Sequence, residues 1–200
     1  MEPSELFFGL CRYYSSLGLD CDVSWSIWGQ RTLSYFDQLG RMLGYIVKNE
    51  ETLTDMEDWK CPRALRGKRI DMVWFYPRKY EYALALEHQK SNSLEQIKLD
   101  IKKLSQVLGL KVLVVYRQNT SEIQSLAARE ISKIEGQDDY FLLFNIPHAR
   151  DFKDEEPLEK LVSRLLDDDG KLVAAGSAEA RKETITGLRF FSNIIWSQER

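Results

Sequence analysis

Residues 69–89 read RIDMVWFYPRKYEYALALEHQ, and this stretch decides the fold. Its first half, Ile70 to Tyr76, is rich in β-branched and aromatic residues and stops at Pro77, which predicts a strand that ends in a turn. Its second half, Tyr82 to Gln89, is predicted to be another strand. We expect the two strands to pair across the Pro77-Arg78-Lys79 turn as neighbours in one sheet.

Downstream of this hairpin, helical and extended patterns alternate. Ser91, Asn92 and Ser93 form an N-cap cluster. The stripe Ile97, Ile101, Leu104 and Leu108 predicts a helix that Gly109 ends. A continuous apolar run follows, with the pattern of a strand buried on both faces. The predicted elements after the hairpin are a helix over 94–108, a strand over 111–116, a helix over 120–134 and a strand over 140–146.

The two ends of the chain extend this α/β pattern. Two helices are predicted over residues 4–17 and 32–48, joined by an aromatic connector around Trp25 and Trp28. The remaining predictions are a helix over about 156–166, an acidic turn at 167–170, and strands over 171–175 and 188–196. Together they predict an α/β protein with a central mixed β-sheet flanked by helices. We expect one domain over residues 1–200, with its core at about 31–146.

Composition excludes several classes of protein. No apolar run reaches the roughly 18–20 residues of a membrane span, and the N-terminus lacks the pattern of a secretory signal. The two histidines, His88 and His148, with three scattered cysteines, do not provide the clustered ligands of a zinc hydrolase. Nucleotide-binding glycine motifs are absent from the sequence. We therefore expect a cytoplasmic protein with no membrane partner, whose chemistry rests on carboxylates and a hard metal ion.

The net charge of −3 hides an uneven distribution. Residues 60–117 carry 13 Lys or Arg and 5 Asp or Glu, a net of +8. Residues 1–59 and 118–200 have net charges of −6 and −5. A basic block of this kind can attract a polyanion even in a slightly acidic protein, although a solvated surface is an equally good interpretation.

Two carboxylates stand out inside the predicted hairpin. Asp71 lies within an apolar strand and Glu87 ends the next one. Such a carboxylate costs several kcal/mol when it is buried without a partner. Alternate residues of a strand share a face, so Gln89 points with Glu87 while His88 points away. If the strands pair, Asp71 and Glu87 converge from the same side on one divalent cation, and two carboxylates plus waters suit Mg²⁺ or Mn²⁺.

These residues resemble the core of the PD-(D/E)XK (restriction-endonuclease-like) nucleases. The resemblance rests on Arg69 to Asp71, Ala83 to Gln89, a helix containing Asp100 and Lys103, and Val112 to Tyr116, and it covers about residues 31–117. It implies a restriction-endonuclease-like fold in which Asp71 and Glu87 bind the metal. The backbone carbonyl of His88 is implied as a further ligand.

The motif departs from the family at one position. The family normally has lysine where this chain has Gln89, and Lys90 lies on the opposite strand face. Gln89 is then expected to orient the attacking water, with a lysine supplied by the following helix. Lys98 and Lys102 are the candidates for that lysine. Asp37, on the helix before the hairpin, is the candidate for an additional acidic residue that family members often carry.

The sequence therefore predicts a metal-dependent nuclease that hydrolyses DNA, with Asp71, Glu87 and Gln89 in catalysis. Backbone phosphates would be bound by basic residues of the middle segment: Arg63, Arg66, Lys68, Arg69, Lys98 and Lys102. One alternative is an inactive module of the same fold that binds nucleic acid or protein, and another is a protein whose basic segment meets an acidic partner. A homodimer is compatible with each of these.

The sequence also allows purely structural roles for the carboxylates. Asp71 could pair with Arg69 or Lys68 at a sheet edge, and Glu87 could pair with Lys111 or Lys98. The acidic run at 167–169 lacks the alternating ligands of a calcium loop, which favours a turn.

Overall fold

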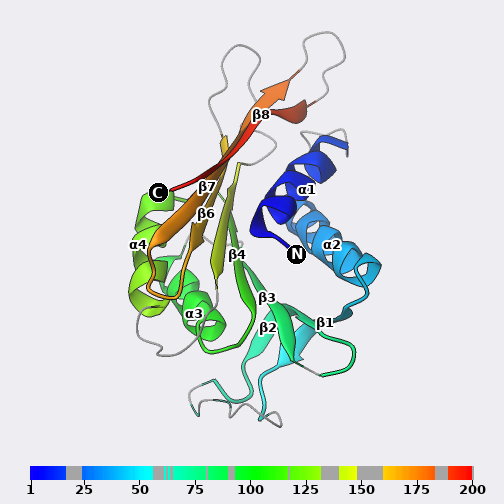
Figure 1. The fold of residues 1–200 in the computed structure, drawn as a ribbon, viewed down its shortest axis with the longest axis vertical. Helices are drawn as coiled ribbons and strands as arrows, with labels where there is room; N and C mark the ends of the chain where they lie inside the picture. Colours follow the sequence, from blue (N-terminus) through cyan, green and yellow to red (C-terminus); the bar gives the residue numbers. More distant parts are fainter. Residues whose placement is uncertain are drawn as a thin grey trace.

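The computed structural model describes residues 1–16, 24–55, 61, 63, 65–79, 81–89, 93–116, 118–131, 140–147, 160–182 and 189–199. Within them, eight strands form one mixed sheet and four helices cover its faces (Figure 1). The predicted α/β class is confirmed. The helices are α1 (Pro3–Ser16), α2 (Trp25–Met42), α3 (Leu94–Leu104) and α4 (Thr120–Ile131). The strands are β1 (Ile46–Thr52), β2 (Arg69–Phe75), β3 (Tyr82–Gln89), β4 (Leu110–Tyr116), β5 (Phe141–Ile146), β6 (Lys160–Leu166), β7 (Leu172–Lys182) and β8 (Arg189–Gln198).

The strands lie in the sheet in the same order as in the sequence. The predicted hairpin is confirmed, because β2 and β3 pair antiparallel. Strands β3, β4 and β5 run parallel to one another, and α3 and α4 lie in the two connections between them. The remaining neighbours pair antiparallel, so the sheet continues without interruption through β6, β7 and β8.

Helices cover both faces of the sheet (Figure 1). On one face, α1 and α2 pack with Trp28, Phe36 and Trp74 in a buried aromatic core. On the other face, α3 and α4 pack over a second core that includes Ile101 and Phe141. Because β4 and β5 are buried from both sides, their sequences read as continuous apolar runs. Among the helices that the structure describes, none has both the length and the apolar character needed to traverse a membrane.

The predicted boundary of the helix before the hairpin was wrong. Helix α2 begins earlier, at Trp25, where the Ser24 hydroxyl accepts from the backbone N–H of Ile27 at 3.4 Å. It ends at Met42, and Gly44 follows in the left-handed conformation with φ of 86°. Residues 46–52 then form the edge strand β1, in which Val47 is the one buried residue. This strand was missed because its exposed polar residues show no apolar alternation.

The predicted helix over 156–166 was also wrong where the structure describes it. Residues 160–166 form strand β6, and its buried face carries Leu161, Ser163 and Leu165. The leucine spacing fits a helix as well as a strand, and the buried serine hides the alternation. The acidic turn is confirmed, since the backbone N–H of Gly170 donates to the Asp167 carbonyl at 3.0 Å. The predicted C-terminal strands are confirmed within β7 and β8.

Gly109 sets the start of β4, and its substitution tests the packing there. Its φ is 86°, and a Cβ would lie 2.5 Å from the Tyr82 carbonyl oxygen. Gly44 shares this φ, but a Cβ added there would meet nothing within 4 Å. Gly44→Ala should lower the free energy of unfolding by about 1–2 kcal/mol from backbone strain alone. Gly109→Ala should lower it by at least about 1 kcal/mol more, because the clash adds to the strain. Urea unfolding measures the free energy of unfolding of both variants. Equal losses of stability in the two variants would contradict the clash at Gly109.

Candidate metal centre

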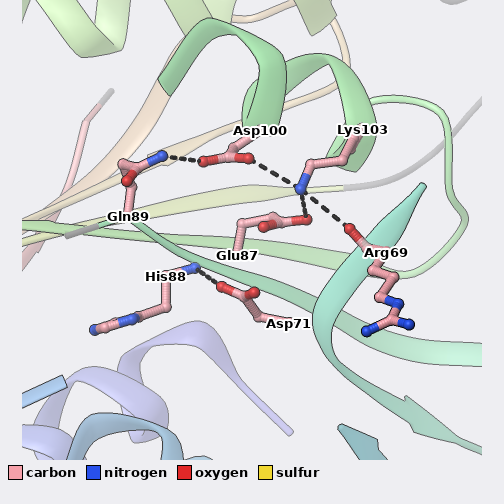
Figure 2. Close-up of polar contacts among 7 residues, drawn as sticks. All are labelled: Arg69, Asp71, Glu87, His88, Gln89, Asp100 and Lys103. Atoms are coloured by element: carbon pink, nitrogen blue, oxygen red, sulfur yellow. Dashed lines mark hydrogen bonds and ion pairs between the residues drawn. The ribbon is translucent and has the colours of Figure 1, made fainter. Parts of the chain in front are cut away.

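The candidate centre forms where the backbone pairing between β2 and β3 ends. The last register pair toward this end is Met72 with Leu86. Beyond it, the Asp71 carboxylate accepts a hydrogen bond from the backbone N–H of His88, with Oδ2 and N 2.8 Å apart (Figure 2). A side-chain oxygen thus replaces the carbonyl that a regular ladder would provide. This holds the Asp71 carboxylate between the two strands.

The alternation of faces along β2 changes at Asp71. Ile70 packs in the core under α3 and α4, whereas Met72 packs in the core under α1 and α2. Across from Asp71, Glu50 has a φ of 52°, between the register pairs Asn49–Met72 and Glu51–Ile70. Asp71 is half-buried at this irregularity. It lines a groove toward α2 and also lies near Glu87.

Glu87 points from β3 toward α3 and is 2% exposed. Its Oε1 lies 2.5 Å from the ammonium nitrogen of Lys103 (Figure 2). Burial raises the pKa of Glu87 well above its ordinary value, and the negative charge of Asp71 raises it further, while Lys103 opposes both. The adjacent-strand arrangement of Asp71 and Glu87 is therefore confirmed, and the two carboxylates interact electrostatically. The expectation of a shared face was wrong, because Asp71 lines the groove by α2 whereas Glu87 contacts Lys103 of α3.

Lys103 connects the carboxylates of β3 and α3. Its ammonium lies 2.5 Å from Glu87, 3.0 Å from Asp100 Oδ1 and 3.1 Å from the backbone carbonyl oxygen of Arg69. Burial lowers the pKa of Lys103, but the charges of Glu87 and Asp100 outweigh burial, and the net direction is upward. Lys103 is therefore a charged group held by three acceptors in a nearly buried position.

Gln89 lies on the same face as Glu87, as the strand alternation predicts. Its side-chain amide donates to Asp100 Oδ2 at 2.7 Å. The two oxygens of Asp100 thus hold Gln89 on one side and Lys103 on the other (Figure 2). Asp100 and Lys103 are three residues apart on α3, so both side chains reach the same edge of β3.

The His88 side chain faces away from the carboxylates, as predicted. Its Nε2 lies 2.6 Å from the Tyr116 hydroxyl, which lies 2.8 Å from the Thr32 hydroxyl. Thr32 in turn contacts the Tyr14 hydroxyl. All four side chains are buried. His88 is therefore anchored twice, through its backbone N–H to Asp71 and through its ring to a chain of hydroxyls that belong to β4, α2 and α1.

The basic residues predicted to bind phosphates are spread over the surface. The prediction that Lys98 or Lys102 leans toward the carboxylates was wrong, because the lysine that reaches them from α3 is Lys103. Lys98 is half-buried and Lys102 is exposed. Exposed ion pairs join Arg66 to Asp55 at 3.0 Å and Arg69 to Glu50 at 2.9 Å. Arg63 and Lys68 are exposed near the start of β2.

A groove of about 580 Å³ opens beside Asp71. Its lining comes from residues within 30–41 of α2, 49–50 of β1 and 71–72 of β2, and we call it the α2 groove. Asp37 lines it together with Asp71. The Arg41 guanidinium donates two hydrogen bonds of 3.0 Å to Asp37 and holds the pKa of that carboxyl below its ordinary value. The helix before the hairpin thus brings an ionised acidic residue to the same groove as Asp71.

Sequence reasoning missed the role of Lys103 and Asp100. The signal was present, because Asp100 follows Ile97 by three residues and so lies on the core-facing stripe of α3. A carboxylate on such a stripe needs a buried partner. Two residues named in the sequence analysis, His148 and Lys90, lie outside the described residues.

Across the described residues, no group of three or more His, Cys, Asp or Glu side chains is placed to hold a metal ion. The ligands predicted from the sequence are two carboxylates, Asp71 and Glu87, with the backbone carbonyl of His88, and so would not form such a group. Mg²⁺ keeps several of its waters and usually takes only one or two carboxylates from a protein. The donor set is all oxygen, which suits Mg²⁺ or Mn²⁺.

The raised pKa of Glu87 predicts a specific pH dependence of stability. The folded chain holds a proton on Glu87 at pH values where the unfolded chain has released it, so wild-type stability falls as pH rises from about 4.5 through the raised pKa. Glu87→Gln lacks this loss. In chelator, its stability relative to wild type should therefore increase across this window and level off above it.

Urea unfolding at a series of pH values checks this dependence, with Glu81→Gln as a control at an exposed position before the same strand. Identical pH profiles for wild type and Glu87→Gln would contradict the assignment of the pKa shift to Glu87.

Comparison with known proteins identifies no relative of this chain. No protein-family model, no curated protein and no solved structure matches it.

Proposed function

We propose that this chain is a divalent-metal-dependent, PD-(D/E)XK-like nuclease that hydrolyses phosphodiester bonds in DNA. One observation carries the proposal: Glu87, buried beside the charged Lys103, interacts electrostatically with the Asp71 carboxylate of the neighbouring strand where the pairing between the two strands ends. A buried carboxylate whose pKa is raised by burial and by a second carboxylate is a frequent property of functional sites. A shared cation would remove the repulsion between the two groups.

The positions of the motif residues support the resemblance to this family. Asp71 lies on β2, Glu87 to Gln89 end β3, Asp100 and Lys103 lie on α3, and 112–116 lie on β4. The segments that carry the resemblance are consecutive elements of one sheet and its covering helix. In a restriction-endonuclease-like core, this arrangement would place the catalytic groups at one edge of the β2–β3 hairpin.

Asp71, Glu87 and the His88 backbone carbonyl would hold the Mg²⁺ or Mn²⁺ ion. When bound, such an ion supplies a more acidic water and neutralises charge on the phosphoryl group. The chain's own contribution is positioning. The His88 N–H fixes the Asp71 carboxylate, and Tyr116 fixes the His88 ring from the opposite face. The burial of Glu87 keeps water away from its carboxylate and strengthens its electrostatic interactions.

Lys103 is the residue that we assign to the role of the missing motif lysine. Its ammonium lies 2.5 Å from Glu87, whereas the neutral Gln89 amide is held by Asp100. A fixed positive charge stabilises negative charge that develops on the phosphoryl group, which an amide cannot do. Gln89 would then orient Asp100, which in turn orients Lys103. This assignment replaces the expectation that Lys98 or Lys102 supplies the lysine.

The basic segment of residues 60–117 would provide the attraction for DNA. Exposed cations near the start of β2 and on α3 can contact phosphates without regard to base sequence. Arg66 and Arg69 pair with Asp55 and Glu50 at the surface, and such exposed pairs are weak enough to exchange for a phosphate.

A second candidate is a binding module of the same fold that has lost catalysis. The observation in its favour is that Lys103 already neutralises Glu87, and that Gln89 is held by Asp100 instead of being directed at a water. Incubation with plasmid and linear DNA separates the two functions. Cleavage with Mg²⁺ or Mn²⁺ and its loss in chelator support the nuclease, while binding without cleavage in any of these conditions supports the module.

The role of Lys103 predicts a loss of rate in a variant that removes its charge but keeps a hydrogen-bond donor. Lys103→Gln should lower the rate of cleavage at saturating DNA by about 10²-fold, the usual effect of removing one group that stabilises transition-state charge. Lys103→Arg should retain more activity than Lys103→Gln because it keeps the charge. Lys171→Met, an exposed lysine outside the basic segment, is the control. Full activity in folded Lys103→Gln would remove Lys103 from the mechanism.

The basic segment predicts how DNA binding depends on salt. Each phosphate contact contributes about 0.9 to the slope of log K against log salt concentration. Replacing both Lys98 and Lys102 with alanine should make this slope shallower by the amount that one or two phosphate contacts contribute. Fluorescence anisotropy in chelator measures it. An unchanged slope would place the DNA-binding surface away from α3.

A further inference from the structure

The α2 groove, next to the candidate metal centre, has the shape of a ligand site. Its volume of about 580 Å³ lies within the range of roughly 300–1,000 Å³ that is usual for pockets that bind small organic groups. It lies between α2 and the β1–β2 edge of the sheet, and Asp71 forms part of its wall. Any group bound there would therefore lie beside the proposed scissile phosphate.

The charges that line the α2 groove do not suit a phosphate. Asp37 and Glu50 are both at the groove, and each is paired with an arginine, Arg41 and Arg69. Asp71 adds a third carboxylate. An anionic backbone group would meet these carboxylates, whereas a neutral group that donates hydrogen bonds would find acceptors.

Amide side chains give the groove its other chemical character. Gln30 and Gln38 project from α2 eight residues apart, with the Ser34 hydroxyl midway between them on the same helix face. Asn49 adds an amide from β1 and lies 3.4 Å from Asp37 through its Nδ2. An Asn or Gln amide offers a donor and an acceptor side by side, which matches a nucleobase edge that carries an amino group next to a ring nitrogen.

Two apolar residues and one strained residue complete the groove. Leu33 from α2 provides an apolar contact for the flat face of a ring, and Met72 from β2 lies fully buried behind the groove wall. Glu50 has a φ of 52° at the rim, and a non-glycine residue in this left-handed region is strained. Strain of this kind is concentrated at binding and catalytic sites.

We propose that the α2 groove binds one nucleobase of the DNA substrate, and that Gln30, Gln38 and Asn49 select a base whose Watson–Crick edge carries an amino group beside an unprotonated ring nitrogen. Adenine and cytosine each present an amino donor beside a ring nitrogen acceptor. Thymine has no amino group, and the two carbonyl oxygens on either side of its N3–H would face the carboxylates of the groove. The proposal extends the proposed nuclease function, because the bound base would belong to the nucleotide at the metal centre.

The test measures binding of single-stranded oligonucleotides in chelator, so that it does not depend on cleavage. Oligo-dA, oligo-dC and oligo-dT of equal length are compared by fluorescence anisotropy at fixed salt. Wild type should bind oligo-dA and oligo-dC about fivefold or more tightly than oligo-dT, the lower range for one well-placed amide pair. The double variant Gln30→Ala/Gln38→Ala should lose this preference and bind oligo-dT as wild type does.

A matched control is Gln96→Ala, an exposed glutamine on α3 outside the groove, which should keep the preference. Adenosine is the second probe, and it should shift the NMR signals of the Gln38 and Asn49 side-chain amides more than thymidine does. Equal binding of the three oligonucleotides, or a preference that survives the double variant, would overturn the base-binding proposal. Failure to bind any oligonucleotide and to cleave any DNA, with adenosine still shifting the two amides, would instead refute the nuclease function and leave the base site standing.

Discussion

The hydrogen bond from the backbone N–H of His88 to the Asp71 carboxylate organises the functional end of the sheet. It forms where the ladder between β2 and β3 stops at Met72 and Leu86. A buried backbone donor without an acceptor would be unfavourable, so the carboxylate is required at this point once the strands separate. The same bond sets the position of Asp71 relative to Glu87, and it leaves the His88 ring on the far side, where Tyr116 holds it.

Stability and function compete at Glu87. A carboxylate that is 2% exposed and lies beside a second carboxylate is costly to ionise, and Lys103 offsets only part of this cost. A protein selected for stability alone could place an apolar residue there. The network of Gln89, Asp100 and Lys103 around this carboxylate is understandable if the charge is needed for a cation. Direct titration with a metal separates this role from that of a structural ion pair.

Much of the fold could be predicted from the sequence, because the buried strands and amphipathic helices have clear apolar periods. Strand β4 and helix α3 are examples. Apolar periodicity did not identify strands that are only slightly buried or that place polar residues in the core. Edge strand β1 shows almost no alternation, and Ser163 interrupts the alternation of β6.

At the site, the strand period correctly placed Gln89 with Glu87 and His88 opposite. It could not identify Lys103, since the helix residue that reaches a strand depends on how α3 packs over β3. It also missed the change of face at Asp71, which lies opposite the irregular backbone at Glu50.

The central claim is that Asp71 and Glu87 hold one divalent cation. The most direct measurement is titration of the metal-free protein with Mn²⁺, with the free ion followed by electron paramagnetic resonance. The account predicts one Mn²⁺ site in the wild-type protein, and an affinity lower by about tenfold or more in Asp71→Asn. Asp37 lies across the α2 groove from Asp71 and is not one of the two proposed ligands. The Asp37→Asn variant should therefore bind Mn²⁺ as wild type does. Wild-type protein that takes up no Mn²⁺, or Asp71→Asn that binds it as tightly as wild type, would contradict the account.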